Sequence, residues 1–114
     1  MKIALFNDNA VGVVDGDHII DITELTGWNH DNPQASLVQL MKEFDTLKPQ
    51  IETHIDSCAV YPVADVALRA PIPNPSKIVA APINYMLHKE EMNTALTVDR
   101  LGFFLKSPSS IIGP

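Results

Sequence analysis

Residues 2–22 read KIALFNDNAVGVVDGDHIIDI, and this stretch decides the fold of the first part of the chain. Apolar and polar residues alternate in three short runs, KIALF, VGVV and HIIDI, which polar turns separate. Alternation with a period of two is typical of strands that bury one face. Asp15-Gly16 lies between the second and third runs and favours a hairpin, because glycine tolerates the positive φ that a tight turn requires. The stretch therefore predicts an antiparallel β-meander.

The period changes in SLVQLMKEFDTLKPQIETH, residues 36–54, which predicts helix. The apolar side chains that recur there at spacings of three and four are Leu37, Leu40, Met41, Phe44, Leu47 and Ile51. Ser36 followed by Gln39 has the form of a capping box, so the helix is expected to begin there. Pro49 predicts a break into a longer and a shorter helix, because a proline inside a helix costs about 3 kcal/mol. We expect the apolar face to pack on the meander.

The rest of the chain predicts a second, smaller segment. Residues 59–70 read as extended chain, and the three prolines of PIPNPSK at 71–77 favour a stiff connector. We expect an α+β fold in which residues 1–70 form a small domain of meander and one or two helices, and 71–77 a linker. Residues 78–114 predict an incomplete, mostly β segment with a short helix at NYMLHKEEM. Because so short a segment cannot easily bury both faces of its sheet, we expect the chain to open a longer protein.

Composition excludes several classes of partner. The chain has 114 residues, 46% hydrophobic and 19% charged, which is typical of a globular protein. Fourteen acids against eight bases give a net charge of -6, and no Lys/Arg cluster indicates nucleic-acid binding. No apolar run approaches the roughly 20 residues that span a bilayer, so no membrane partner is expected.

Cys58 is the single cysteine, so neither an intrachain disulfide nor a thiolate metal cluster is expected. We interpret it as a small apolar residue. The amino-terminal residues lack the apolar run of a secretory signal, and we expect a cytoplasmic protein.

His88 and Glu91 are the candidate catalytic pair. They lie three residues apart in INYMLHKEEMN, residues 83–93, so on a helical turn they share a face. The carboxylate can orient the imidazole, or the pair can hold a water and take its proton. The alternative, which spacing alone favours, is a solvated polar face with Lys89 and Glu90 pointing elsewhere.

Other chemical interpretations are weaker. His88 and Glu91 would need a further ligand to hold zinc, and nothing places HIDSC, residues 54–58, near them. We interpret His18 and His30 as structural or solvated. Ser109-Ser110 lacks the G-x-S-x-G context of a nucleophile, and the five scattered glycines form no phosphate loop. Lys106, after an apolar run, either meets an anionic substrate or extends to solvent.

The ordered motifs of residues 71–114 resemble the opening of the catalytic domain in the fumarylacetoacetate hydrolase superfamily. They are the proline-rich connector, the strand KIVAAPI, the pair Asn84-Tyr85, the His88-x-x-Glu91 helix and the run FLKSPSSIIGP. The first 70 residues resemble, in a more general way, the small amino-terminal domain of many bacterial members. Pro82 stands where many members have glycine and Leu87 where aspartate is common, which can change substrate choice.

The resemblance implies an enzyme that hydrolyses, isomerises or decarboxylates oxo-acids such as acylpyruvates with Mg²⁺ or another divalent cation. It implies a catalytic dyad of His88 and Glu91, with Lys106, Asn84 and Tyr85 in substrate binding. The family's metal-binding carboxylates match no acid of this chain by motif. We therefore expect no metal ligand here, and neither ion binding nor turnover by the chain alone.

A different class of function stays open. Residues 1–70 hold no chemical motif, and the second segment is expected to expose apolar surface that drives association. The alternative is therefore a non-catalytic interaction or assembly module. For the enzyme, we expect a small oxo-acid substrate and a homo-oligomer.

Overall fold

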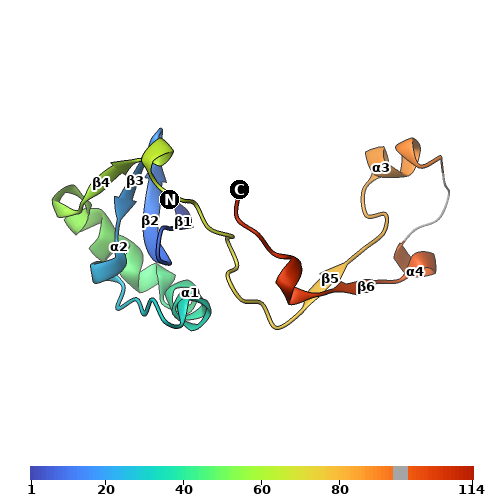
Figure 1. Cartoon of the computed structure of the whole chain (residues 1–114), viewed down its shortest axis with the longest axis horizontal. Helices are drawn as coiled ribbons and strands as arrows, with labels where there is room; N and C mark the ends of the chain where they lie inside the picture. The colour runs from blue at the N-terminus through green and yellow to red at the C-terminus, as the bar shows by residue number, and fades with distance from the viewer. Residues whose placement is uncertain (94–97) are drawn as a thin grey trace. The chain divides into compact units, whose positions relative to one another are not determined.

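The computed structural model describes residues 1–93 and 98–114 (Figure 1). They divide into two compact units, the first formed by Met1–Asn74 with Ile111–Pro114 and the second by Pro75–Ser110. The last four residues, expected in the second segment, thus group with the first unit. Both units contain an antiparallel sheet and helices, so the predicted α+β fold is confirmed.

The first unit is built on a four-stranded antiparallel sheet of order β1-β2-β3-β4. Its strands are β1 (Lys2–Phe6), β2 (Ala10–Asp15), β3 (His18–Asp21) and β4 (Val60–Pro62). Val13 at the centre pairs with Ile3 on one side and Ile20 on the other. The meander predicted from the alternating pattern is confirmed. Strand β4 adds an edge strand, and it comes from residues 59–70, which were expected to be extended but not to pair with the sheet.

The two meander turns use residues that tolerate a positive φ. Asn7 and Asn9, between β1 and β2, have φ of 47° and 60°. Gly16, between β2 and β3, has φ of 58°, in agreement with the hairpin that Asp15-Gly16 predicts. Asparagine is among the few residues other than glycine that adopt this conformation readily.

Helix α1 (Pro33–Lys42) begins three residues earlier than predicted. Its N-cap is Asn32, whose side-chain oxygen accepts a hydrogen bond of 3.3 Å from the backbone N–H of Ala35. Asparagine is a preferred N-cap, and Pro33 suits the first helical position because its missing N–H would have no partner there. The capping box predicted at Ser36 is wrong, because the Ser36 hydroxyl instead accepts a hydrogen bond of 2.9 Å from the N–H of Asn29.

The break between the helices lies at Glu43, not at the predicted Pro49. Helix α2 (Phe44–His54) contains Pro49 in its interior, where the proline removes one backbone hydrogen bond. Ile51, which is buried, and Leu47, which packs against the core, hold α2 on the sheet. Packing therefore outweighs the local preference at this position.

The sheet is covered on both faces. Side chains from β1, β2, α1 and α2, with Ile22 from the end of β3, form the main core, made of Leu5, Val11, Val13, Ile22, Leu37, Leu40 and Ile51. On the opposite face, Phe6, Ala10 and Ile19 are buried against the chain that follows β4. The predicted packing of the helices on the meander is confirmed, but Met41, expected on the apolar face, is 66% exposed.

The chain after β4 is fixed to the end of β1 before the connector begins. The N–H of Asn7 donates to the carbonyl of Ala67 at 2.7 Å, and the N–H of Ala67 donates to the Asn7 side chain at 3.0 Å. Gly113 lies close to the same segment, because a Cβ there would stand 2.8 Å from the Leu68 carbonyl oxygen. Single 3-10 turns complete the structure at η1 (Thr23–Leu25), η2 (Ile55–Ser57), η3 (Val63–Asp65) and η4 (Pro108–Ser110).

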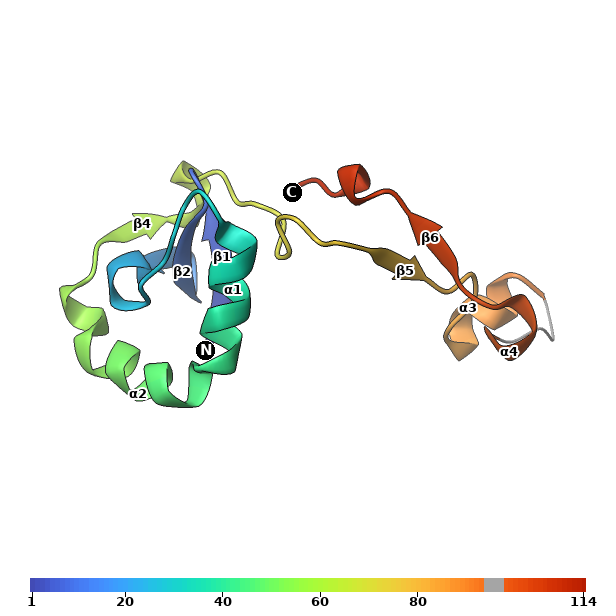
Figure 2. The same cartoon turned by 90° about the horizontal axis from the view of Figure 1, so that it is seen from below.

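The second unit contains a two-stranded antiparallel ribbon and two short helices. Its elements are β5 (Ile78–Ala80), α3 (Met86–Glu91), α4 (Val98–Leu101) and β6 (Phe104–Lys106). Figure 2 shows β5 and β6 side by side, with α3 and α4 beyond the same end of the ribbon. A membrane span would need a longer and more apolar helix than any that the described residues form.

Candidate active site

The short helix α3 brings His88 and Glu91 together. Nδ1 of His88 lies 3.4 Å from Oε2 of Glu91, at the long end of the hydrogen-bonding range. The His88 side chain is 32% exposed and that of Glu91 is 74% exposed. Because catalytic hydrogen bonds are often long before substrate binds, this geometry suits a pair that tightens around a ligand.

Tyr85 lies at the start of α3 and flanks the histidine. Its ring centroid is 5.5 Å from that of His88, with an angle of 34° between the planes. The Tyr85 carbonyl accepts a hydrogen bond of 3.1 Å from the N–H of Lys89, which closes the first turn of the helix. His88 is therefore placed between an aromatic ring and a carboxylate, and its Nε2 atom is the nitrogen left for a water or a substrate.

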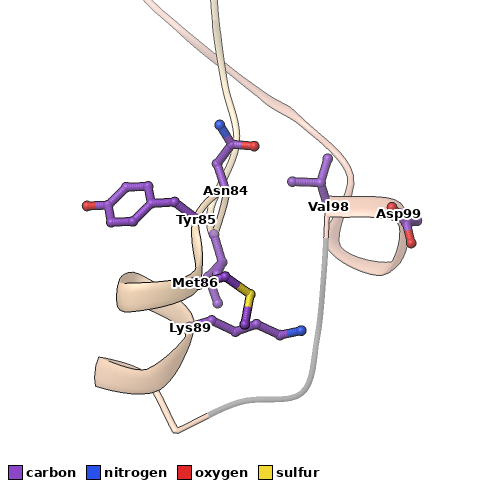
Figure 3. A pocket seen from close by; sticks show the side chains of 7 residues that line it. Asn84, Tyr85, Met86, Lys89, Val98 and Asp99 are labelled. Atoms are coloured by element: carbon purple, nitrogen blue, oxygen red, sulfur yellow. The ribbon is translucent and has the colours of Figure 1, made fainter.

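A pocket of about 450 Å³ lies between α3 and α4 (Figure 3). It is lined by Ile83, Asn84, Tyr85, Met86, Lys89, Val98 and Asp99. Asn84 and Tyr85 were predicted to shape a substrate site. His88 and Glu91 are outside this lining, so the dyad stands beside the pocket rather than in it.

Lys89 and Asp99 also line the pocket, although neither is a candidate from the sequence alone. In the alternative interpretation of a solvated polar face, Lys89 and Glu90 point away from His88; the Lys89 side chain is half-buried. The sequence around Lys89 does not indicate that it lines a pocket. The opposite wall is α4, a helix of only four residues, which is too short to show a helical hydrophobic period.

Lys106, the third predicted substrate-binding residue, is not part of this pocket. It ends β6 opposite Ile78, and its Nζ atom lies 6.0 Å from the ring centroid of Phe104. That distance is at the limit of a cation–π contact, and the side chain is exposed. Its role in substrate binding stays a prediction.

The residues present do not form a metal site. No three His, Cys, Asp or Glu side chains are grouped to hold an ion anywhere in residues 1–93 and 98–114. The zinc alternative for His88 and Glu91 therefore lacks its further ligand within this part of the chain. In HIDSC, the ring of His54 instead bonds to the Gln50 carbonyl at 2.8 Å.

The remaining histidines and the cysteine have local structural roles. Nδ1 of His18 lies 2.7 Å from the Asp17 carboxylate, and Nδ1 of His30 lies 2.9 Å from the Asp8 carbonyl oxygen. Burial, together with the Asp21 carboxylate, raises the pKa of the Cys58 thiol. A raised pKa disfavours the thiolate, so Cys58 is a poor nucleophile.

The chain is similar along nearly its whole length to maleylpyruvate hydrolases. It is 39% identical to the maleylpyruvate hydrolase of Aquipseudomonas alcaligenes over 126 aligned positions, which cover 99% of this chain and 44% of the relative. The crystal structure of maleylpyruvate hydrolase from Sphingobium sp. SYK-6, in complex with manganese(II) and pyruvate, superposes with a TM-score of 0.79 at 37% identity. These relatives agree with the resemblance to the fumarylacetoacetate hydrolase superfamily that the motifs of residues 71–114 carry. No family model matches it.

The chain covers only part of each relative. The match to the manganese complex covers 98% of this chain and 39% of that one. A second structure of the Sphingobium hydrolase agrees, with a TM-score of 0.78, 36% identity, and coverage of 98% and 38%. The chain thus spans less than half the length of the relatives it matches, and the superfamily resemblance carried by its motifs is confirmed.

Proposed function

We propose that the chain supplies the proton-transfer dyad of a metal-dependent hydrolase that cleaves a carbon–carbon bond in an acylpyruvate. The observation that carries the proposal is the pairing of His88 and Glu91 on α3, beside a pocket lined by Asn84 and Tyr85. The similarity to maleylpyruvate hydrolases supports the class of substrate.

In the proposed reaction, His88 acts as the general base. Glu91 accepts a hydrogen bond from Nδ1 and leaves Nε2 free to take a proton from water. The water oxygen bonds to the acyl carbonyl carbon of the substrate while His88 becomes an imidazolium that the Glu91 carboxylate stabilises.

Collapse of the tetrahedral adduct then breaks the bond between the acyl carbon and the adjacent CH₂ group. The electron pair of that bond leaves with the pyruvate fragment as its enolate. The imidazolium of His88 returns its proton to the enolate carbon, which gives pyruvate and the free acid of the acyl group. One water is consumed, and His88 ends in its starting protonation state.

We further propose that the complete enzyme uses a divalent cation, magnesium or manganese, at ligands other than those grouped in the described residues. The manganese(II) bound in the Sphingobium hydrolase supports a divalent cation. Hard carboxylate ligands would suit magnesium equally. Because the residues described here do not form such a site, no step above is assigned to the ion.

Several finer properties belong to the same proposal. The dyad would serve isomerisation or decarboxylation of a related oxo-acid as well as hydrolysis, since each needs a proton moved at carbon. We propose a cytoplasmic enzyme, supported by a single cysteine, and a homo-oligomer. Support for the oligomer comes from β5 and β6, where the paired residues Val79 and Leu105 are both exposed.

That exposed ribbon also favours the second candidate function, an assembly module without catalysis. Val79, Phe103 and Leu105 are 59%, 69% and 72% exposed, and a two-stranded ribbon is rarely stable alone. Light scattering of the 114-residue chain tests this candidate. Self-association that Leu105→Lys abolishes would support it, and a monomer at all concentrations would contradict it.

Kinetics of the complete enzyme test the catalytic proposal. With an acylpyruvate and Mn²⁺ or Mg²⁺, His88→Ala and Glu91→Gln are expected to lower kcat about 100-fold, the range for loss of a general base. Glu90→Gln is the matched control, because Glu90 is adjacent and exposed but is not paired with His88. Equal activity of Glu91→Gln and Glu90→Gln would overturn the dyad.

A further inference from the structure

The second unit is an excursion of the chain that starts from the first unit and returns to it. Its residues, Pro75–Ser110, are preceded by Asn74 and followed by Ile111, and both of these flanking residues group with the first unit. The excursion carries His88 and Glu91 on α3. Contacts at its two ends therefore act on the segment that holds the dyad.

The entering end is attached to α1 and β1. The backbone N–H of Asn74 donates a hydrogen bond of 3.3 Å to Oε1 of Gln34 on α1. Just before it, Pro71 and Ile72 line an apolar hollow of about 230 Å³ that they share with residues of β1 and α1. The chain is thus held on the first unit up to the residue at which the excursion begins.

The returning end approaches the first unit at a glycine. A Cβ added to Gly113 would stand 2.8 Å from the carbonyl oxygen of Leu68 and 3.5 Å from the backbone nitrogen of Ala70. Real Cβ atoms essentially never come within 3.0 Å of another heavy atom, so a side chain at this position requires a shift of the backbone. Glycine is thus needed here for the close approach of two backbone segments. We call this contact of Gly113 with residues 68–70 the clasp.

The segment that Gly113 meets is itself fixed by hydrogen bonds. The Arg69 N–H donates to the carbonyl of Leu5 at 2.8 Å, and the Asn7 N–H donates to the carbonyl of Ala67 at 2.7 Å. These bonds tie residues 67–70 to the end of β1. A side chain at position 113 would therefore displace the returning chain rather than the segment that it meets.

The ribbon of the second unit gains stability from such a closure. Strands β5 and β6 pair only from Ile78 with Lys106 to Ala80 with Phe104, and an isolated two-stranded ribbon is marginal in water at best. Holding the two ends of the excursion together removes part of the loop-closure entropy that pairing must otherwise overcome. The clasp therefore favours the paired ribbon, and α3 follows directly from β5 in the chain.

We propose that the first unit holds both ends of the segment that carries the dyad, and that Gly113 is the positioning residue that closes the clasp. The inference gives a function to residues 1–70, which contain no chemical motif. Gly113 acts through the ribbon on His88 and Glu91, so only its effect on catalysis rests on the proposed function.

Amide exchange with solvent, measured by NMR on the 114-residue chain, tests the clasp without reference to activity. In Gly113→Ala the amides of β5 and β6 are expected to exchange about threefold faster, because the ribbon opens more often, while those of β2 stay unchanged. Ile112→Ala is the matched control, since the Ile112 side chain is 83% exposed next to the clasp. Unchanged exchange in β5 and β6 of Gly113→Ala would overturn the proposal. Equal acceleration in β2 would overturn it as well, because the first unit as a whole would then be less stable.

A second variant, Gln34→Ala, releases the entering end and leaves the glycine in place. It removes the acceptor for the Asn74 N–H and is expected to accelerate exchange in β5 and β6 about twofold. Gln39→Ala is its control, because Gln39 lies on the same helix but its side chain bonds to Glu43. Equal exchange in these two variants would overturn the claim that the first unit holds both ends.

Kinetics of the complete enzyme connect the clasp to catalysis. With an acylpyruvate and Mn²⁺ or Mg²⁺, Gly113→Ala is expected to lower kcat about tenfold and to leave KM within about twofold, since a displaced dyad slows proton transfer. Faster ribbon exchange in Gly113→Ala, in an enzyme whose turnover does not need His88, would overturn the catalytic proposal and retain the clasp. Turnover that needs His88, with kcat and ribbon exchange both unchanged in Gly113→Ala, would overturn the clasp alone.

Discussion

The ring of Tyr85 lies 5.5 Å, centroid to centroid, from the imidazole of His88. Together with the 3.4 Å approach of Glu91 to Nδ1, this contact restrains the imidazole from two sides. A histidine that must pass a proton from water to carbon benefits from such restraint, because proton transfer requires a fixed geometry at Nε2.

We therefore expect Tyr85→Ala to lower kcat of the complete enzyme about tenfold, since loss of the ring frees the imidazole. Tyr85→Phe keeps the ring and is expected to stay within about threefold of the unsubstituted protein. Steady-state kinetics with an acylpyruvate measure both. Equal losses in the two variants would instead assign the effect to the Tyr85 hydroxyl.

The amino-terminal cap of α1 gives a prediction about stability. Asn32→Ala removes the acceptor for the Ala35 N–H and is expected to lower the free energy of unfolding by about 1 kcal/mol. Urea unfolding of the 114-residue chain, followed by fluorescence of Trp28, the single tryptophan, measures the change. Ser36→Ala is the comparison: it removes the exposed hydrogen bonds between the Ser36 hydroxyl and Asn29, and a larger loss there than at Asn32 would contradict Asn32 as the main cap of α1.

Much of the first unit was predictable because its pattern is local. The alternating apolar and polar residues of 2–22, with Gly16 at the turn, are sufficient to predict strands β1 to β3. A period of two determines both the register of the strands and which side chains face the core. The start of α1 was missed because two caps competed within a few residues, and Asn32-Pro33 outweighs Ser36. Strand β4 was not recognised because it has three residues and exists through its pairing with β3.

The candidate site was predictable only in part. Spacing places His88 and Glu91 on one turn, and the structure brings them together. Lys89 was missed because the wall that makes it line a pocket comes from α4, several residues later in the chain. Periodicity reports which residues share a face of one element, and it carries no information about which separate elements meet.

Cys58 gives a prediction about reactivity and pH. Burial and the Asp21 carboxylate raise the pKa of its thiol, so less thiolate is present near pH 8 than in an exposed cysteine. We expect alkylation by iodoacetamide to be several-fold slower than for the urea-unfolded chain at that pH, and to accelerate as pH rises towards the raised pKa. Mass spectrometry of timed samples measures the rate. Equal rates in the folded and unfolded chain would show that Cys58 is not protected.

The raised pKa of Cys58 also makes the free energy of unfolding depend on pH. Because the folded state disfavours the Cys58 thiolate, the unfolded chain loses its proton at lower pH than the folded one. The contribution of this residue to the free energy of unfolding is therefore constant below the ordinary thiol pKa and falls as pH rises above it. Urea unfolding of the unsubstituted chain and of Cys58→Ala, compared at pH 7 and above pH 9, isolates the effect as a difference. A difference that does not change with pH would contradict it.

The main core supplies the prediction with the largest expected effect. Ile51 is fully buried between α2 and the sheet, so Ile51→Ala leaves a cavity and is expected to cost about 2–5 kcal/mol in the free energy of unfolding. Met41→Ala is the matched control, because both residues were expected on one apolar face but Met41 is 66% exposed; we expect a loss below about 1 kcal/mol there. Urea unfolding followed by Trp28 fluorescence compares the two. Comparable losses would mean that Met41 contributes to the core as the helical pattern alone predicts, and that the orientation of α1 differs from the one described.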